Sequence, residues 1–371
     1  EGRMTDPRPP RSRWATLRWI ALLVFVVGGI ALFGLLIYFS GPAQVFAEIV
    51  RMGIMGFLAV VLCVVASMLA WSLSWYSLLR GAGIATSFRH IVPPLLAGFT
   101  VTYLTPSAYL GGEPVRAYWV ARDQGVPMAR VMATVVVERI LAGFAMIAFA
   151  SIGAVFAVAA PQIPAAERGA IAVALGTLTL LLVVALIPLT RNARWLSGVV
   201  AWTARFLPGR QRVLRAAAHV ADMEDEIHRA FTQYRGFTFL ALGFQLLTVF
   251  LNYIRPQIFF FSTQRALFTF PQLSLYFTLS VFVNAFLWFA PGGFGLTDGG
   301  RVAIFTLLGI PASGGVAFNV VFRFVDLVLV GIGVQLLVRR GLLSLRRGRI
   351  KVAVGQDPPA GQGTSSNPSG E

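Results

Sequence analysis

The sequence predicts an all-α polytopic membrane protein with about six full transmembrane helices and two re-entrant helical hairpins, arranged as inverted-topology repeats. Of its 371 residues, 57% are hydrophobic and only 12% are charged, and the mean hydropathy is +0.74. A soluble domain carries about twice that share of charged residues. Several apolar runs are long enough to cross a membrane, and one pattern of charges, glycine and proline occurs twice between them.

Six apolar runs have the length of a transmembrane helix, which needs about 20 residues to cross a hydrocarbon core of about 30 Å. These runs are Trp19 to Phe39, Met52 to Leu79, Met128 to Ala160, Gly169 to Leu189, Phe237 to Ile254 and Ala312 to Val338. Two further runs, Ile91 to Leu110 and Gln272 to Ala290, each end in a break that is followed by a short segment. Each of these two runs either crosses the membrane or folds back with its short segment as a re-entrant hairpin.

The placement of the arginines favours the hairpins. If both runs crossed the membrane, the arginine-rich segment 191–236 would lie on the side opposite the basic N-terminus, against the positive-inside bias. With two hairpins, every strongly basic segment lies in the cytoplasm. We therefore expect a multi-pass protein of the cytoplasmic (inner) membrane with both termini in the cytoplasm.

This topology divides the chain into a transmembrane domain and two cytoplasmic ends. The predicted parts are a basic N-terminus (1–18), a transmembrane domain (19–340) with repeat one at 52–160, a cytoplasmic amphipathic segment at 190–236 and repeat two at 237–338, and a tail (341–371). The tail is basic at first and then rich in glycine, proline and serine, which predicts disorder. The two repeats cross the membrane in opposite directions, as in many transporters.

The duplicated pattern joins an acid, an arginine three residues later, a Gly-(Val/Ile)-Pro turn and a second arginine. The copies are Glu113, Arg116, Gly125 to Pro127 and Arg139, and Asp298, Arg301, Gly309 to Pro311 and Arg323; Glu138 and Asp326 are further acids beside the second arginines. Each copy follows a hairpin break, with Pro106, Gly111 and Gly112 in the first and Pro291, Gly292, Gly293 and Gly295 in the second. A charge at the centre of a membrane costs at least roughly 2.5 to 3.5 kcal/mol, so duplicated charges indicate a binding or transport site.

We expect these charges to form a site for a lipid headgroup near the membrane midplane. Arg139 and Arg323 each lie eleven residues into a predicted span, at a depth of about 17 Å. Two helix N-termini, one capped by Glu113 and the other by Thr297 or Asp298, and up to four arginines directed at one cavity would bind a phosphate. Alternatively, the charges form salt-bridge networks that lock the hairpins to the spans.

Two local pairings belong to that alternative. Arg323 and Asp326 lie on the same helical face and could neutralise each other, as could an acid and arginine three residues apart on a short helix. Glu138 points about 100° away from Arg139 around the helix, and we expect it to pair elsewhere. The tryptophans Trp71, Trp75 and Trp288 are expected near membrane interfaces.

Composition also indicates what the protein does not bind. The net charge of +16 is spread between apolar runs without an aromatic-basic recognition motif, so we expect anionic lipid headgroups and no nucleic acid as partners. The single cysteine, Cys63, and three dispersed histidines predict neither a disulfide nor a metal site. The residues indicate no cofactor.

Taken together, these motifs resemble a known family. Pro106-x4-Gly-Gly-Glu-x2-Arg116, Glu138-Arg139, and Pro291-Gly-Gly-Phe-Gly-x2-Asp298 followed by Gly-Ile-Pro and Arg323 are similar to the flippase-like transmembrane domain of lysylphosphatidylglycerol synthases, over residues 15–340. The resemblance implies lipid translocation with these arginines and acids near the headgroup. Only residues 339–371 follow Val338, so we expect a stand-alone member without the aminoacyl-transferase domain; Asp298 replaces the usual glutamate.

The leading hypothesis is therefore a lipid translocase and not an enzyme, acting on a phospholipid or an isoprenoid-phosphate lipid. One alternative is a non-catalytic membrane partner of a glycolipid or cell-envelope synthase. Another is an intramembrane lipid transferase with Glu113 or Asp298 as the base. The last lacks a nucleophile and base pair, a metal set or a nucleotide-binding loop in the sequence.

Overall fold

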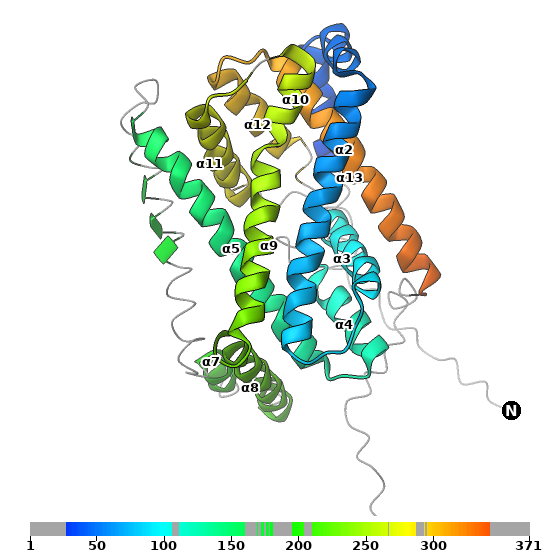
Figure 1. The fold of residues 1–371 in the computed structure, drawn as a ribbon, viewed down its shortest axis with the longest axis vertical. Coiled ribbons are helices and arrows are strands. Elements are labelled where there is room, and N and C mark those ends of the chain that lie inside the picture. The colour runs from blue at the N-terminus through cyan, green and yellow to red at the C-terminus, as the bar shows by residue number, and fades with distance from the viewer. Residues whose placement is uncertain are drawn as a thin grey trace, which may run out of the picture.

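The protein is helical throughout the part that the computed structural model describes, which comprises residues 27–105, 111–159, 195–203, 210–265, 267–286, 293 and 295–341, with single residues between 169 and 180. The helices are Val27–Phe39, α2 (Pro42–Gly81), the 3-10 helix η1 (Phe88–His90), α3 (Val92–Leu104), α4 (Glu113–Gln124), α5 (Met128–Ala159), α7 (Trp195–Thr203), α8 (Arg210–Thr232), α9 (Arg235–Tyr253), α10 (Arg255–Gln264), α11 (Phe270–Phe286), α12 (Leu296–Leu307) and α13 (Ala312–Arg339) (Figure 1). No strand occurs among these residues.

Four segments are long and apolar enough to cross a membrane: Pro42–Gly81, Met128–Phe156, Arg235–Gln264 and Ala312–Arg339. They correspond to four of the six predicted spans. The first predicted span is described only as the short helix Val27–Phe39, and the predicted span at 169–189 lies almost wholly outside the described residues. The third segment extends ten residues past the predicted end at Ile254, because α10 continues the apolar sequence directly after α9.

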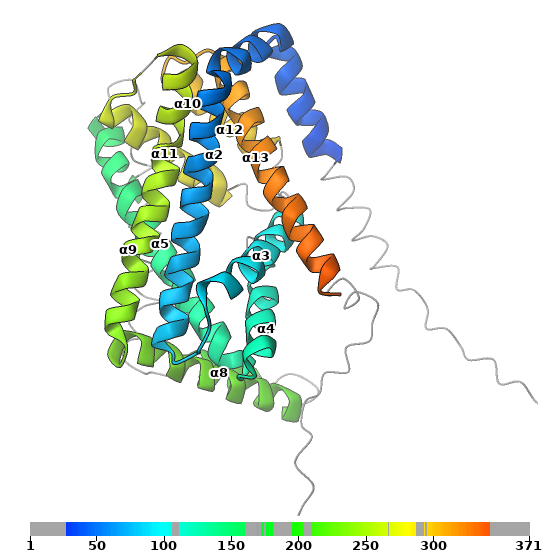
Figure 2. The ribbon, with the colours of Figure 1, turned by 45° about the vertical axis from the view of Figure 1, so that its right-hand side comes forward.

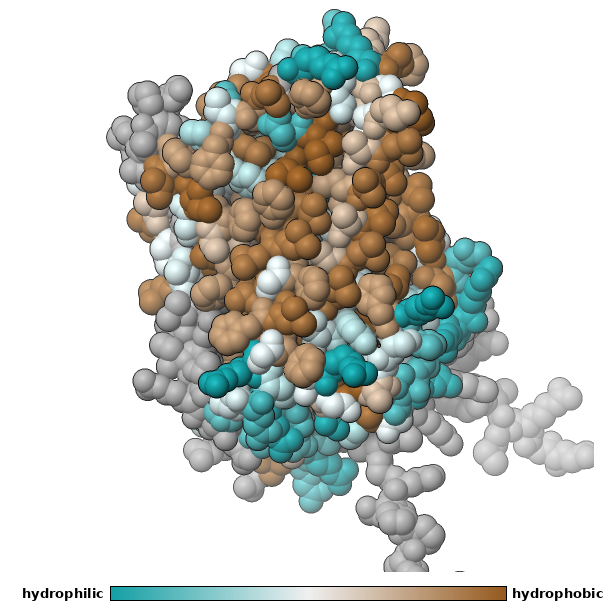
Figure 3. All heavy atoms as spheres, in the orientation of Figure 1, coloured by the Kyte–Doolittle hydropathy of each residue, from teal (hydrophilic) through white to brown (hydrophobic). Residues whose placement is uncertain are grey.

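The spans expose apolar surface on the outside of the molecule. Only 28–39% of the residues in the most apolar window of each span are buried. Hydrophobic side chains cover the middle of the molecule and hydrophilic ones gather toward its two ends (Figure 3). Since an exposed apolar belt of this extent is unfavourable in water, the chain is a multi-pass membrane protein.

Two hairpins of short helices lie at opposite ends of the bundle. The pair α3 and α4 lies at the end where α8 and the last turn of α13 are found, whereas α11 and α12 lie at the other end (Figures 1 and 2). At the first end, Arg340 donates to Asp123 of α4 over 3.3 Å. The order span, hairpin, span therefore occurs twice, as α2 to α5 and as α9 to α13, and the two units run in opposite directions.

The repeated Gly-x-Pro has the same backbone role in both units. Gly125 ends α4 with φ 63° and Gly309 follows α12 with φ 83°, a left-handed conformation that glycine adopts without strain. Pro127 and Pro311 then immediately precede the first residues of α5 and α13. The turn thus connects the second hairpin helix of each unit to the following long helix. Because the arginine lies eleven residues into that helix in both units, its distance from the turn is the same in both.

Each long helix packs against the first hairpin helix of the other unit. Thr100 of α3 donates to the carbonyl of Val330 in α13 (3.4 Å), and Thr278 of α11 donates to the carbonyl of Ala150 in α5 (2.8 Å). In each case a glycine, Gly333 or Gly153, lies three residues beyond the carbonyl, where a Cβ would come within 1.9 to 2.2 Å of the threonine hydroxyl. These matched contacts interlock the two units at close helix separation.

The predicted amphipathic segment forms α7 and α8. α8 crosses the end of the bundle beneath α5 and α9 (Figure 2) and buries Ala217, Ile227 and Ala230. Tyr234 then connects α8 to α9, and its hydroxyl donates to the carbonyl of Glu226 (3.2 Å). Burial raises the pKa of Tyr234 to about 12, so this hydroxyl keeps its proton at physiological pH.

Candidate functional site

Four charged residues of the first repeat form what we call the first charge cluster: Glu113 and Arg116 of α4, and Glu138 and Arg139 of α5. The ion pairs are crossed, since Arg116 donates to Glu138 and Arg139 donates to Glu113. Glu113, Arg116 and Glu138 are buried, whereas 35% of the Arg139 side chain is exposed. With two acids and two arginines, the cluster is electrically neutral.

Side chains from α2 and α9 complete the first charge cluster. Trp71 Nε1 and Gln245 Nε2 both donate to Glu138 Oε1, over 2.8 and 2.7 Å. The Arg116 guanidinium lies 5.4 and 4.8 Å from the ring centroids of Trp71 and Trp75, within the range of cation–π attraction. Trp75 has no exposed surface and donates to Thr134, so it packs inside the protein beside Arg116; Trp288 lies outside the described residues.

The second charge cluster consists of Asp298 and Arg301 of α12 and Arg323 of α13. Arg323 binds Asp298 through two hydrogen bonds, Nε to Oδ1 (3.2 Å) and Nη2 to Oδ2 (3.0 Å), and Arg301 Nη1 lies 3.7 Å from the same carboxylate. Arg323 also donates to the hydroxyl of Tyr103 in α3, over 2.8 Å. Asp298 is completely buried, and bidentate charge-assisted bonds of this kind are strong.

The duplicated pattern thus forms the same ion pair twice. Glu113 to Arg139 and Asp298 to Arg323 each connect the first turn of the second hairpin helix to the residue eleven positions into the following long helix. The repeats differ at the position before that arginine, where the first has Glu138 and the second has Phe322. As a result, Arg116 has a carboxylate of its own, whereas Arg301 shares Asp298 with Arg323.

A polar cavity of about 210 Å³ adjoins the second charge cluster. It is lined by Arg301 and by Asn252, Arg255, Tyr276, Phe277, Ser280, Asn284, Phe318, Phe322 and Asp326. Its walls therefore carry two guanidinium groups, one carboxylate and several hydrogen-bonding side chains. Such a lining can hold a small anionic or zwitterionic group.

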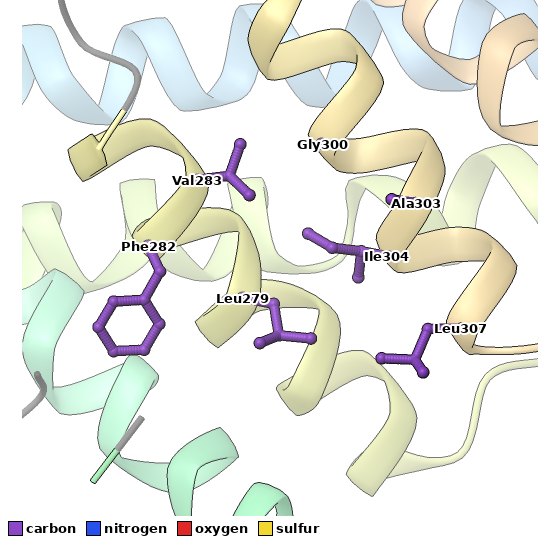
Figure 4. Close-up of a pocket in the computed structure, with 7 residues that line it drawn as sticks. All are labelled: Leu279, Phe282, Val283, Gly300, Ala303, Ile304 and Leu307. Carbon is purple, nitrogen blue, oxygen red and sulfur yellow. The ribbon is translucent and has the colours of Figure 1, made fainter. Parts of the chain in front are cut away.

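A larger, open groove of about 570 Å³ lies between α11 and α12 and is apolar. Figure 4 shows its residues facing one another from the two helices: Leu279, Phe282 and Val283 on α11, and Gly300, Ala303, Ile304 and Leu307 on α12. None of these side chains carries a charge or a hydrogen-bonding group. The groove can accommodate a hydrocarbon chain but offers no polar group to a headgroup.

Three expectations about the site are wrong in detail. Glu113 does not cap α4, because Gly112 occupies the N-cap position and the carboxylate pairs with Arg139. Asp326 does not form an ion pair with Arg323, whose partner is Asp298, but lines the polar cavity. The four predicted arginines form two clusters and do not converge on one described cavity; of these four, only Arg301 lines the polar cavity.

Other expectations hold. Asp298 takes part in capping α12 from the third helical position: Gly295 is the N-cap residue and its N–H donates to the Asp298 carboxylate (3.0 Å), while Thr297 donates to the Gly293 carbonyl. Glu138 does pair away from Arg139. Gly112 lies where α3 and α4 approach so closely that a Cβ would be 1.8 Å from the Gly98 carbonyl. Of the other residues predicted at the hairpin breaks, Gly111 lies in a bend. Pro106, Pro291 and Gly292 lie outside the described residues.

Four polar residues of the site were missed at the sequence level: Tyr103, Gln245, Arg255 and Asn319. Asn319 donates to the backbone carbonyl of Asp298 (3.0 Å), and Arg255 donates to Ser67 (3.2 Å). Each is a polar residue in or directly beside an apolar run, which is a usable signal of function. The predicted span ends at Ile254, one residue before Arg255, although the apolar sequence resumes at Ile258.

Comparison with known proteins agrees with this architecture. Residues 6–333 match the family described as the lysylphosphatidylglycerol synthase TM region. A UPF0104 membrane protein of Methanothermobacter thermautotrophicus is 25% identical over 315 residues, 82% of this chain and 90% of that protein. Another, from Pyrococcus horikoshii, is 27% identical over 135 residues, 36% of this chain and 40% of that protein. No solved structure matches. The chain therefore belongs to the lysylphosphatidylglycerol synthase transmembrane-region family.

Proposed function

We propose that this protein is a lipid translocase that moves a phosphate-containing lipid across the cytoplasmic membrane. The observation that carries the proposal is the duplicated buried ion pair between a hairpin helix and a long helix, with a positively charged cavity beside the second copy. Buried charges without a partner are costly in a membrane, so arginines that face a cavity favour an anionic substrate. A phospholipid or an isoprenoid-phosphate lipid has such a group.

The hairpins are proposed to be re-entrant. Their helices contain 13 and 12 residues in the first repeat and 17 and 12 in the second. At 1.5 Å per residue these helices are about 18 to 26 Å long, short of a hydrocarbon core of about 30 Å. Hairpins that enter from opposite sides would make the two units inverted-topology repeats, with the charge clusters at mid-membrane.

Alternating access would come from a movement of one unit against the other. The headgroup phosphate would compete with Asp298 for Arg301 and Arg323, while the hydrocarbon chain remains in lipid. The first charge cluster, which is neutral and contains the buried Arg116–Glu138 ion pair, would hold its hairpin to α5 during this movement. Termini and α8 on the cytoplasmic side satisfy the positive-inside bias.

The proposal is tested in proteoliposomes by the transbilayer movement of labelled phospholipids and isoprenoid phosphates. Wild-type protein is expected to accelerate at least one lipid. Arg323→Ala and Arg139→Ala are expected to abolish this activity, because each removes the arginine of a duplicated ion pair. A matched control is Arg229→Gln, which breaks an exposed pair on α8. Full activity of both alanine variants in folded protein would overturn the assignment of the site.

A membrane partner of a glycolipid or cell-envelope synthase remains the second candidate. The neutral, internally paired first charge cluster favours it, because such a network can serve only to lock a hairpin in place. Association with a synthase that survives the arginine substitutions, with no lipid movement in proteoliposomes, would support this role. An intramembrane transferase is less well supported, since Glu113 and Asp298 are both engaged by arginines and not available as a base.

A further inference from the structure

The structure assigns an anion-binding site to the polar cavity of the second repeat, where we propose that Arg255 and Arg301 bind the phosphate group of an amphiphile. This inference rests on the proposed function and assigns the binding site to one repeat. It brings in Arg255, which lies outside the duplicated pattern. The first repeat then has a structural role, and only the second binds the ligand.

Arg255 lies within an apolar helical segment, and its main electrostatic partner is Asp326, which lines the same cavity without forming an ion pair with it. Its Nη2 donates to Ser67, its guanidinium carbon lies 5.5 Å from the Phe322 ring centroid, and its buried Nε has no acceptor. Among the described residues, no carboxylate lies within 4.0 Å of it. The cation is therefore held in place by neutral groups, with donor capacity left for an anion at the cavity wall.

The two repeats differ in the net charge of their buried residues. In the first charge cluster, two carboxylates neutralise two arginines. Among the described residues around the cavity, the charges are those of Arg255, Arg301 and Arg323 and of Asp298 and Asp326, which leaves one net positive charge. The cause is a single position: Glu138, which neutralises Arg116, corresponds to Phe322, which lines the cavity beside Arg255.

The cavity chemistry selects a phosphate group. Two guanidinium groups can each donate two hydrogen bonds to phosphate oxygens, and the amides of Asn252 and Asn284 can donate further ones. A volume of about 210 Å³ admits a compact headgroup but not a sugar chain. The phosphate could belong to a lipid or to free inorganic phosphate, and the two sources need separate probes.

The test places a carboxylate where the first repeat has one. Phe322→Glu is expected to neutralise the cavity and to weaken binding of dioctanoyl phosphatidic acid to the full-length protein in detergent by at least about tenfold. Phe322→Gln, which makes a similar change of shape and polarity without a charge, is expected to weaken binding less than Phe322→Glu does, and Arg229→Gln on α8, outside the cavity lining, is expected to bind as wild type does. Dioctanoylglycerol and inorganic phosphate are the comparison probes; binding of phosphate alone as tightly as the lipid would identify a free-anion site.

A second variant keeps the test decisive if Phe322→Glu does not fold. Arg255→Gln keeps a hydrogen-bond donor to Ser67 and is expected to reduce binding of the same probe to a similar extent, with wild-type thermal stability as the control for folding. Wild-type affinity in either folded variant overturns the site. If binding is lost in the variants but no lipid moves in wild-type proteoliposomes, the site stands and the translocase proposal fails. If lipid moves equally in wild type and Phe322→Glu, the translocase stands and this site is wrong.

Discussion

The carboxylate of Glu138 joins three helices through hydrogen bonds from Trp71 on α2, Arg116 on α4 and Gln245 on α9. It has no exposed surface, so bulk solvent cannot replace a lost partner. Removing one member of a buried ion pair leaves the other charge unpaired, which costs far more than the pair itself contributes. Glu138 is therefore primarily a structural residue in this arrangement.

Glu138→Gln is expected to destabilise the protein by about 3 to 5 kcal/mol, because Arg116 would stay buried without a counter-charge. Thermal unfolding in detergent, followed by circular dichroism, measures the effect. The control is Arg229→Gln, which breaks the exposed pair with Glu226 and is expected to cost about 0 to 1 kcal/mol. Equal melting temperatures for the two variants would show that the first charge cluster does not stabilise the fold.

At the level of helices, the reciprocal contacts of α3 with α13 and of α5 with α11 depend on two glycines. A Cβ on Gly333 would lie 1.9 Å from Thr100 Oγ1, and one on Gly153 would lie 2.1 Å from the Ser274 carbonyl. Neither neighbour can move away without separating the helices, since one is backbone and the other is bonded to the opposing helix. Close packing at a glycine therefore holds the first helix of each hairpin against the long helix of the other unit.

Gly333→Ala and Gly153→Ala are each expected to destabilise the protein by about 1 to 3 kcal/mol through overpacking. Gly331→Ala is the matched control in the same helix, because nothing lies within 4 Å of a Cβ there. The control is expected to be neutral or to stabilise by up to about 1 kcal/mol, since alanine favours helix more than glycine does. Chemical or thermal unfolding of the three variants in one detergent tests the difference; tolerance of alanine at 333 and 153 would contradict the close packing.

For the whole molecule, the arrangement of the helices determines which arginines lie at each end, and this distribution predicts the orientation in the membrane. The hairpin α3 and α4, the arginine-containing helix α8 and the end of α13 with Arg339 and Arg340 lie at one end, and α11 and α12 lie at the other (Figure 2). In the proposed topology the first end faces the cytoplasm, as the positive-inside bias predicts. Arg215 on α8 and Arg265 after α10 are exposed at the two ends.

In a Cys63→Ala background, a cysteine at Arg215 is expected to react with a membrane-impermeant maleimide only from the cytoplasmic side, and one at Arg265 only from the outside. Labelling in right-side-out and inverted vesicles measures both. Replacement of buried Cys63 removes the native thiol from the assay. The proposed topology has an odd number of membrane crossings between the two positions. If both were labelled from the same side, the number would be even, and the two repeats would not be inverted.

The sequence by itself determined the helical membrane class, four of the spans, the helical segment α8 and the doubling of the unit, because hydropathy, charge bias and Gly-x-Pro turns act locally along the chain. It also identified the arginines and acids of both clusters, since charges in apolar sequence are conspicuous. It could not determine which acid meets which arginine. Neighbours three residues apart suggested pairing within a helix, whereas Arg116 pairs with Glu138 on α5.

Only the tertiary structure decided the partners, because residues such as Gln245, Tyr103 and Arg255 reach the clusters from helices far away in the chain. The asymmetry between the repeats also appears only in three dimensions. In sequence, Glu138 and Phe322 are single residues beside an arginine; in the fold, one neutralises its cluster and the other leaves a cavity with net positive charge. Side-chain packing between helices sets these contacts, and local sequence patterns carry no information about it.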